Sequence, residues 1–243
     1  MSAGPAERFA AAIRAENAAG RVAVIPDIKC ISPKEGDLLR GRDPVATAQM
    51  LVRCGAPALS VVTESERFGG SMALLEAIAR AVAVPVLRKD FIANEDQLLE
   101  TAASGAAAVL LICATIDEKK LPTLYEKALA LGLEALVEVH TAQEMALANA
   151  LGARLVGINN RNIVALERDD GGPERTAALA AGLPLGALLI SESGIQSTDD
   201  AKLAAAAGAN AVLVGTALWQ ARDMEAMYQD LRVERKAASC GPS

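Results

Sequence analysis

The stretch AKLAAAAGANAVLVG, residues 201–215, carries the pattern that decides the fold. Its first part favours a helix, Gly208-Ala209 follow, and Asn210–Gly215 is an apolar run typical of a buried strand. Glycine directly after a helix is common because it adopts the left-handed turn that ends many helices without a Cβ clash. The stretch therefore predicts a helix that ends at a glycine and leads into a strand.

The same order of helix, Gly-Ala pair and strand recurs over residues 98–112 and 144–159. Eight apolar runs along the chain are predicted strands: Val22–Lys29, Ala58–Thr63, Val84–Lys89, Ala107–Ile112, Leu133–Val139, Arg154–Asn159, Ala187–Glu192 and Asn210–Gly215. Strands this rich in Val, Ile and Leu are typical of a parallel sheet that is covered on both faces. Eight βα units in a chain of 243 residues predict an α/β fold, a single (β/α)8 TIM barrel with a short N-terminal helix.

A doubly wound open sheet is the alternative, although it usually has fewer strands and a glycine-rich first turn. We expect one barrel domain over residues 1–243, with a helical arm at 1–21 and a polar, frayed tail at 233–243.

Pro26 lies inside the first predicted strand, where it cannot donate a hydrogen bond to a neighbouring strand. We therefore expect a bulge or another local irregularity there.

The composition excludes several classes of protein. Aromatic residues make up only 2% of the chain and the net charge is −6, which argues against binding to nucleic acid. No apolar run approaches the roughly 20 residues that span a bilayer, and the N-terminus does not resemble a secretory signal. The four scattered cysteines are typical of free thiols in a reducing compartment. We expect a cytoplasmic protein that is a monomer or a weak homo-oligomer.

Polar side chains gather at the C-terminal ends of the predicted strands, where barrel enzymes carry their active sites. They are Asp27, Lys29, Lys89, Glu138, Asn159, Arg161 and Glu192. Charges at the ends of apolar strands are costly to bury unless they are paired or used. Three cations and three carboxylates from different strands predict an anion-binding acid/base site. The alternative is a ring of ion pairs that only closes the barrel core.

Two glycine-containing turns are candidates for a phosphate site. Ser193-Gly194 follows the seventh predicted strand and Gly215-Thr216 ends the eighth, and these two loops commonly bind phosphate in barrels. Phe68 and Phe91 are candidates for an apolar wall beside a ligand, with plain packing as the alternative.

The only histidine, His140, leaves no histidine cluster for zinc. We interpret His140 as a loop residue and expect no metal.

Six motifs at the strand ends carry a resemblance to a known family. They are Asp27-Ile-Lys-Cys-Ile-Ser-Pro33, Pro85-Val-Leu-Arg-Lys-Asp-Phe-Ile92, Leu136-Val-Glu-Val-His140, Gly157-Ile-Asn-Asn-Arg-Asn162, Ser191-Glu-Ser-Gly-Ile195 and Val214-Gly-Thr-Ala-Leu218. With these motifs the chain resembles the indole-3-glycerol phosphate synthase family of tryptophan biosynthesis, from Val24 to about Met224. The third-strand motif and the Ile-Asn-Asn-Arg motif are the most specific of the six.

The resemblance implies a ring closure that needs no cofactor. In it, 1-(o-carboxyphenylamino)-1-deoxyribulose 5-phosphate becomes indole-3-glycerol phosphate with loss of carbon dioxide and water. By resemblance, Lys89 is the general acid and Glu138 its acid/base partner, Lys29 bridges substrate anions, and Asp27 stands where the family usually has glutamate. The other matched residues position the substrate (Asn159, Arg161, Glu192), lie over its anthranilate end (Ser32) or hold its phosphate (Ser193, Gly194, Gly215, Thr216).

Four features depart from the family pattern, and one of them is the stretch Glu167–Pro173 after the sixth predicted strand. Pro26-Asp27 stands where the family commonly has Ala-Glu, and Lys34-Glu35 follows Ser32-Pro33 in place of Ser-Lys. The arm before the first strand is shorter than usual, so we expect the covering helix to be missing or shortened. From Pro26 we expect a distortion that pushes Asp27 inward, so that it reaches as far as a glutamate would.

Two other functions stay open from the sequence. The first is a paralogous barrel lyase that acts on a related anthranilate-derived phosphosugar. The second is a non-catalytic barrel that binds phosphate, which the presence of Lys89, Glu138 and Glu192 disfavours. In each case the expected partner is a small phosphorylated molecule.

Overall fold

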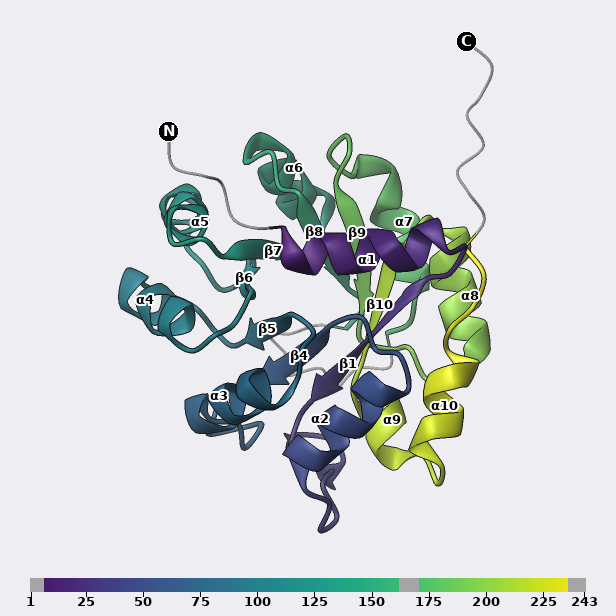
Figure 1. The fold of residues 1–243 in the computed structure, drawn as a ribbon. Coiled ribbons are helices and arrows are strands. Elements are labelled where there is room, and N and C mark those ends of the chain that lie inside the picture. Colours follow the sequence, from purple (N-terminus) through teal and green to yellow (C-terminus); the bar gives the residue numbers. More distant parts are fainter. Residues whose placement is uncertain (1–6, 162–170, 236–243) are drawn as a thin grey trace.

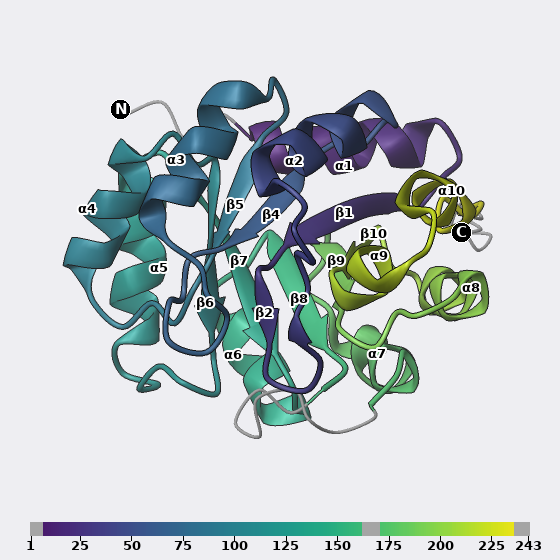
Figure 2. The same cartoon turned by 90° about the horizontal axis from the view of Figure 1, so that it is seen from below.

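The computed structural model describes residues 7–161 and 171–235. Within these ranges parallel strands close into a barrel, and helices surround it (Figure 1, Figure 2). The barrel strands are β1 (Ala23–Ile28), β4 (Leu59–Val62), β5 (Val86–Lys89), β6 (Ala108–Ile112), β7 (Glu134–Val139), β8 (Leu155–Asn159), β9 (Leu188–Glu192) and β10 (Ala211–Val214). Each lies within one of the eight predicted strands, so the predicted (β/α)8 barrel is confirmed.

The first strand closes the barrel by pairing on both sides. Ala23 to Pro26 lie opposite Ala211 to Val214 of β10, and Asp27 lies opposite Ser60 of β4. This closure makes the open-sheet alternative wrong. The register stays constant through Pro26, so the bulge expected there is wrong as well. Proline removes a single donor, and its fixed φ is compatible with an extended strand at the point where β1 changes partner.

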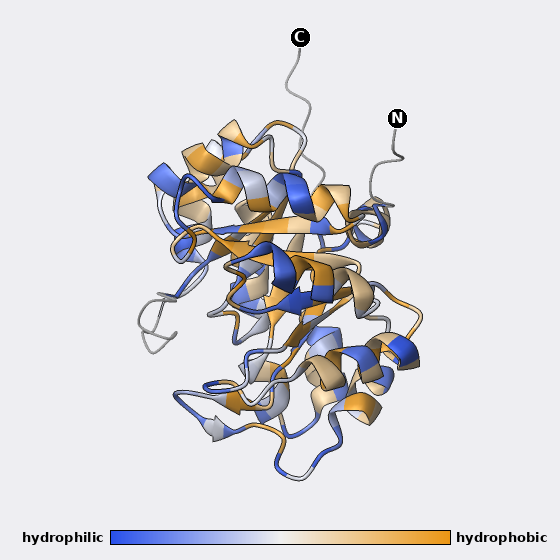
Figure 3. Cartoon of the chain, turned by 90° about the vertical axis from the view of Figure 1, so that its left-hand side faces the viewer, coloured by the Kyte–Doolittle hydropathy of each residue, from blue (hydrophilic) through white to orange (hydrophobic). Residues whose placement is uncertain are grey.

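Most helices follow a strand and cover the outside of the barrel. They are α2 (Pro44–Arg53), α3 (Met72–Ala81), α4 (Glu95–Ala103), α5 (Leu121–Ala130), α6 (Ala142–Ala150), α7 (Glu174–Leu179) with the short 3-10 helix η1 (Ala180–Gly182), α8 (Thr198–Ala206), α9 (Thr216–Gln220) and α10 (Met224–Asp230). Asp43, Ser71, Asn94 and Ser197 each begin a helix by accepting a backbone N–H. Figure 3 shows the resulting pattern, with apolar strands inside and mixed polarity on the helices around them.

The N-terminal arm forms one helix, α1 (Arg8–Ala18), as predicted. Phe9 and Ile13 are fully buried in the same apolar cluster as strand residues such as Ile25. The carboxylate of Glu134, the first residue of β7, accepts the backbone N–H groups of Phe9 and Ala10. The helix α1 therefore covers the N-terminal end of the barrel, as Figure 1 shows, and leaves the opposite end to the predicted site.

The start of the C-terminal tail is paired, so the expectation that it is frayed is wrong as far as Arg235. The carbonyl of Val233 accepts the N–H of Val22 at 3.0 Å, and the N–H of Arg235 donates to the carbonyl of Gly20 at 2.9 Å. The turn between α1 and β1 has backbone groups that need partners, and the tail supplies them. Residues 236–243 lie outside the described part of the chain.

Cys30, Cys54 and Cys113 are free thiols, as predicted, and Cys240 lies outside the described residues. Burial raises the pKa of the Cys113 thiol to about 12. None of the helices in the described ranges is long and apolar enough to cross a membrane.

Candidate active site

A cavity of about 470 Å³ opens at the C-terminal ends of the strands. The predicted site residues that line it are Asp27, Lys29, Lys89, Phe91, Arg161, Ser193, Gly194, Gly215 and Thr216. Glu138, Asn159 and Glu192 are fully buried beside it. The structure therefore brings residues from the ends of six strands, and from the loops after them, to one place, as the barrel topology predicts.

The ammonium of Lys89, at the end of β5, lies between two buried carboxylates. Its Nζ is 3.3 Å from Oε2 of Glu192 and 3.7 Å from Oε2 of Glu138. Both glutamate side chains have no exposed surface, whereas that of Lys89 is 12% exposed and reaches the cavity. The two carboxylates hold the ammonium at the cavity wall, where it can donate a proton to a bound ligand.

Asn159 and His140 lie on the other side of Glu138. The amide Nδ2 of Asn159 donates to Oε1 of Glu138 at 3.2 Å, and Nε2 of His140 lies 3.5 Å from the same oxygen. Asn159 in turn accepts the backbone N–H of Arg161 at 3.0 Å. The amide thus links the buried carboxylate to the loop that carries Arg161 into the cavity.

The position of the Glu192 carboxyl group depends on glycine at residue 157 of β8. A Cβ built on Gly157 would lie 1.9 Å from Oε1 of Glu192. Burial raises the pKa of Glu192 to about 8, an effect that the nearby Lys89 ammonium opposes and the Glu138 carboxylate increases. Glu192 therefore releases its proton less readily than an exposed glutamate would.

Asp27 and Lys29 leave the end of β1 on the same side, as their spacing predicts. Oδ1 of Asp27 accepts a 2.6 Å hydrogen bond from Ser60 on β4, and its Oδ2 lies 3.3 Å from the Cβ position of Gly215. The ammonium of Lys29 lies 5.7 Å from the centroid of the Phe68 ring, which supports it by a cation–π contact. Phe68 and Phe91 both line the cavity, as the apolar-wall interpretation requires.

The loop after β9 contains the predicted Ser193 and Gly194 and is held by Asn160, which the sequence analysis did not select. Ser193 and Gly194 have positive φ angles of 61° and 70°, and a Cβ on Gly194 would lie 2.2 Å from a backbone carbonyl oxygen. The buried side chain of Asn160 donates to the Ser193 carbonyl at 2.9 Å and accepts from Thr176. This amide fixes a strained turn. The position of Asn160 inside the Ile-Asn-Asn-Arg motif could have pointed to it from the sequence.

Ser32 does not line the cavity. It belongs to a small hairpin, β2 (Ile31–Ser32) and β3 (Gly36–Asp37), and its Oγ accepts the backbone N–H groups of Lys34 and Glu35. Those two residues line the cavity instead, and Glu35 accepts a 2.8 Å hydrogen bond from Gln220 of α9. The side chains that depart from the family pattern therefore face the site, while Ser32 shapes the turn that presents them.

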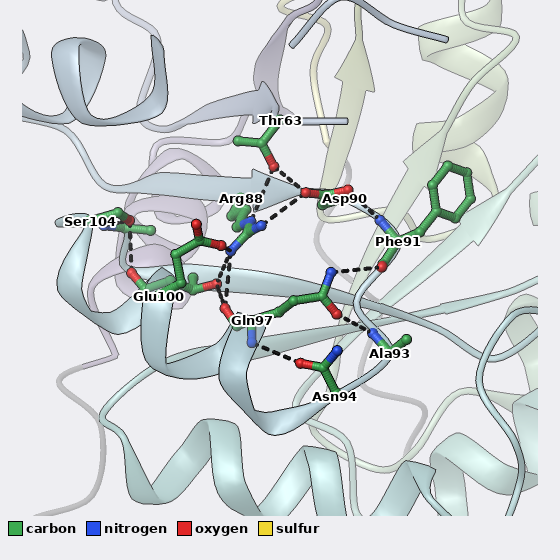
Figure 4. A network of polar contacts seen from close by, with 11 residues as sticks. Thr63, Arg88, Asp90, Phe91, Ala93, Asn94, Gln97, Glu100 and Ser104 are labelled. Carbon is green, nitrogen blue, oxygen red and sulfur yellow. Dashed lines mark hydrogen bonds and ion pairs between the residues drawn. The ribbon is translucent and has the colours of Figure 1, made fainter. Parts of the chain in front are cut away.

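A second network, also not anticipated, anchors the end of β5 from the outside of the barrel (Figure 4). Arg88 is 3% exposed and donates to Thr63, Asp90 and Glu100. Asp90 also accepts from Thr63 at 2.6 Å and from the N–H of Phe91 at 2.8 Å. Successive side chains of a strand point to opposite faces, so Arg88 points outward where Lys89 points inward. A charged residue at this position of an apolar strand could have predicted the network from the sequence.

Across residues 7–161 and 171–235, no three His, Cys, Asp or Glu side chains are grouped so that they could hold a metal ion. The site thus places an ammonium group and buried carboxylates, which can exchange protons, beside other cationic groups and two glycine-containing turns that line the cavity.

Comparison with known proteins points to one family. The family model described as indole-3-glycerol phosphate synthase matches residues 1–231. A protein of that name from Parafrankia sp. is 47% identical over 213 residues, which cover 88% of this chain and 78% of the relative. A second, from Thermococcus kodakarensis, is 42% identical over 218 residues, which cover 90% of this chain and 95% of the relative.

A solved structure shows the same fold at low sequence identity. Thiamine phosphate pyrophosphorylase from Pyrococcus furiosus superposes with a TM-score of 0.62 at 16% identity, covering 87% of this chain and 93% of that one. The family match spans nearly all of the chain, and the relatives align over most of their own length. The chain therefore belongs to the indole-3-glycerol phosphate synthase family.

Proposed function

We propose that the chain closes the indole ring of indole-3-glycerol phosphate from 1-(o-carboxyphenylamino)-1-deoxyribulose 5-phosphate, as a carboxy-lyase of tryptophan biosynthesis. The observation that carries the proposal is Lys89, held 3.3 and 3.7 Å from two fully buried glutamates at the wall of a cavity in a chain of this family. A lysine placed in this way can protonate a carbonyl oxygen as a carbon nucleophile attacks the carbon.

The reaction is a condensation followed by two losses. The ring carbon that bears the carboxylate attacks the ketone carbon, and the ketone oxygen takes a proton from Lys89 and becomes a hydroxyl. The bond to the carboxylate then breaks, carbon dioxide leaves, and the bonding electrons restore the aromatic ring. The hydroxyl leaves as water with one proton, and loss of the adjacent carbon-bound proton completes the indole. Glu138 exchanges protons in this dehydration.

The remaining residues bind and orient the substrate in this proposal. Lys29 and Arg161 attract its anionic groups, and Asn159 and Glu192 hold Glu138 and Lys89 in place. The backbone of Ser193-Gly194 and of Gly215-Thr216 takes the phosphate, and both pairs line the cavity. Phe91 packs against the aromatic ring, and Asp27 occupies the position of the usual glutamate.

The test is a fluorescence assay for indole formation with the substrate named above. We expect the purified protein to convert it without added metal or cofactor. Absence of indole fluorescence from well-folded protein at high enzyme concentration would contradict the proposed function.

A related lyase with a modified aromatic substrate is the second candidate. It is favoured by one observation: Asp27, Lys34 and Glu35, which depart from the family pattern, all line the cavity. The discriminating experiment compares kcat/KM for the parent substrate with kcat/KM for ring-substituted analogues. A clear preference for an analogue would support the second candidate, and a preference for the parent would support the first.

We also propose that the chain works as one barrel domain in the cytoplasm, as a monomer or a weak homo-oligomer. The free thiols of Cys30, Cys54 and Cys113 support a reducing compartment. Sedimentation at micromolar concentration tests the oligomeric state.

A further inference from the structure

His140 lies between two carboxylates, next to the residues proposed above to carry the reaction. Its side chain is 9% exposed at the end of β7. Nε2 lies 3.5 Å from Oε1 of Glu138, and Nδ1 lies 3.4 Å from Oε2 of Glu144 in the first turn of α6. The residue is therefore in a loop, as interpreted from the sequence, but its ring faces inward to the buried glutamate.

The two oxygens of Glu138 have different surroundings. Oε1 receives the amide of Asn159 at 3.2 Å and faces His140, whereas Oε2 faces the ammonium of Lys89 at 3.7 Å. Oε2 is buried and has no hydrogen-bond partner among the described residues. The terminal torsion of a glutamate is soft, so the groups on the Oε1 side decide where Oε2 points.

We propose that His140 is a positioning residue, whose Nε2 holds Oε1 of Glu138 so that Oε2 stays directed at Lys89 and the substrate. The proposal rests on the proposed function, because it gives Glu138 a role in proton transfer. Glu144 anchors the ring, since it faces Nδ1 and also accepts the backbone N–H of His140. Both ring nitrogens are buried and have no hydrogen bond among the described residues, because contacts of 3.4–3.5 Å are long for hydrogen bonds. Catalytic contacts are often long without substrate and shorten when it binds.

The neighbouring element β6 adds no competing charge. The residue that follows it, Cys113, donates its backbone N–H to the carbonyl of Glu138 at 3.0 Å. Burial raises the pKa of its thiol to about 12, so the thiol stays neutral. Within residues 7–161 and 171–235, the charged groups that contact His140 are thus Glu138 and Glu144, with Lys89 beyond Glu138.

Three substitutions of His140 test the contributions of its two ring nitrogens separately. The amide nitrogen of glutamine in His140→Gln replaces Nε2, which faces Glu138, and that of asparagine in His140→Asn replaces Nδ1, which faces Glu144. The leucine in His140→Leu fills the space of the imidazole ring but cannot donate a hydrogen bond. We expect His140→Leu and His140→Asn to lower kcat by about ten- to hundredfold, the range for losing a hydrogen bond to a charged group. We expect His140→Gln to stay within about threefold of wild type, with KM changed little in all three.

A role in packing alone predicts no difference between the glutamine and asparagine variants at matched thermal stability. Equal losses in the three variants, no loss in any, or a higher kcat for asparagine than for glutamine would overturn the proposal.

A second readout does not depend on turnover. His140 is the only histidine of the chain, so the imidazole proton signals in an NMR spectrum belong to this residue. Glu138→Gln should shift these signals in the full-length protein, whereas Glu66→Gln, at an exposed position, should not. Unchanged signals in Glu138→Gln would overturn the contact, and with it the proposal, whatever the enzyme activity. Failure of wild-type protein to form indole would instead contradict the proposed function.

Discussion

At the scale of single residues, the site depends on where a side chain fits and how its charge is held. Gly157 leaves the space that Glu192 occupies, and a Cβ there would lie 1.9 Å from the carboxyl oxygen. Ser60 holds the shorter Asp27 by a 2.6 Å hydrogen bond. Glu192 leads to a prediction about stability, and Asp27 leads to a prediction about activity.

The stability of the protein should fall as the pH rises, because of Glu192. Its pKa is raised from 4.5 to about 8 by burial, so between these values the folded state keeps a proton that the unfolded state releases. Native protein that binds more protons than unfolded protein loses stability with increasing pH. Glu192→Gln keeps the shape but has no proton to release.

Urea denaturation of wild type and Glu192→Gln at about pH 5 and about pH 8 checks this expectation. The wild type should lose more stability than the variant between the two pH values, while the exposed Glu66→Gln control should follow the wild type. Equal losses in wild type and Glu192→Gln would be inconsistent with a proton held on Glu192.

Asp27→Glu should raise kcat/KM on the parent substrate. The undistorted register of β1 removes the reason to expect that Pro26 pushes Asp27 inward. The aspartate carboxylate therefore ends about 1.5 Å short of a glutamate carboxylate, and displacements of this size affect catalysis strongly, about 10²-fold per 1 Å. The measurement is steady-state kinetics of Asp27→Glu, alone and with Pro26→Ala. A decrease in kcat/KM that Pro26→Ala reverses would restore the idea that the two residues compensate each other.

At the scale of an element, β5 shows how a strand can carry catalysis on one face and anchoring on the other. Lys89 points to the cavity, while Arg88 points outward and donates to Glu100 and Thr101 of α4 and to Asp90 after the strand (Figure 4). Arg88 is buried, so its loss leaves acceptors without a donor.

Arg88→Met should therefore destabilise the fold by about 2–5 kcal/mol, as expected when one partner of a buried charged network is removed. The matched control is Arg80→Met, because Arg80 is 71% exposed and pairs with Glu76 on its own helix. That control should change stability by less than about 0.5 kcal/mol. Chemical denaturation measures both, and similar small effects would show that the network has no anchoring role.

At the scale of the whole molecule, the barrel separates a stabilising end from a reactive end. The helix α1 covers the N-terminal end through Phe9 and Ile13, and the cavity opens at the opposite end. Conservative changes under α1 should therefore affect stability and leave catalysis intact.

Phe9→Ala should cost about 3–5 kcal/mol of unfolding free energy, the usual range for a fully buried phenylalanine. The kcat and KM of the folded fraction should match wild type, because the helix lies at the other end of the barrel. Arg8→Ala on the exposed side of the same helix is the control. A selective loss of kcat in Phe9→Ala, without loss of stability, would contradict this separation of ends.

Much of this architecture could be predicted because the decisive features are local. Helix, glycine and strand follow each other in sequence, and barrel topology then brings Lys89, Glu138 and Glu192 together. Contacts between distant backbones could not be predicted in this way. The pairing of the tail with Gly20, the turn formed around Ser32 and the position of His140 beside Glu138 depend on the packing of several elements at once.

The central claim is that Lys89, held by two buried glutamates, is the general acid of the ring closure. Its most direct test is kcat for Lys89→Ala, measured by indole fluorescence beside wild type and Lys34→Ala, a second lysine that lines the cavity. We predict that Lys89→Ala lowers kcat by about 10²–10⁴-fold with a small change in KM, and that Lys34→Ala acts mainly on KM. A kcat for Lys89→Ala close to that of wild type would contradict the account.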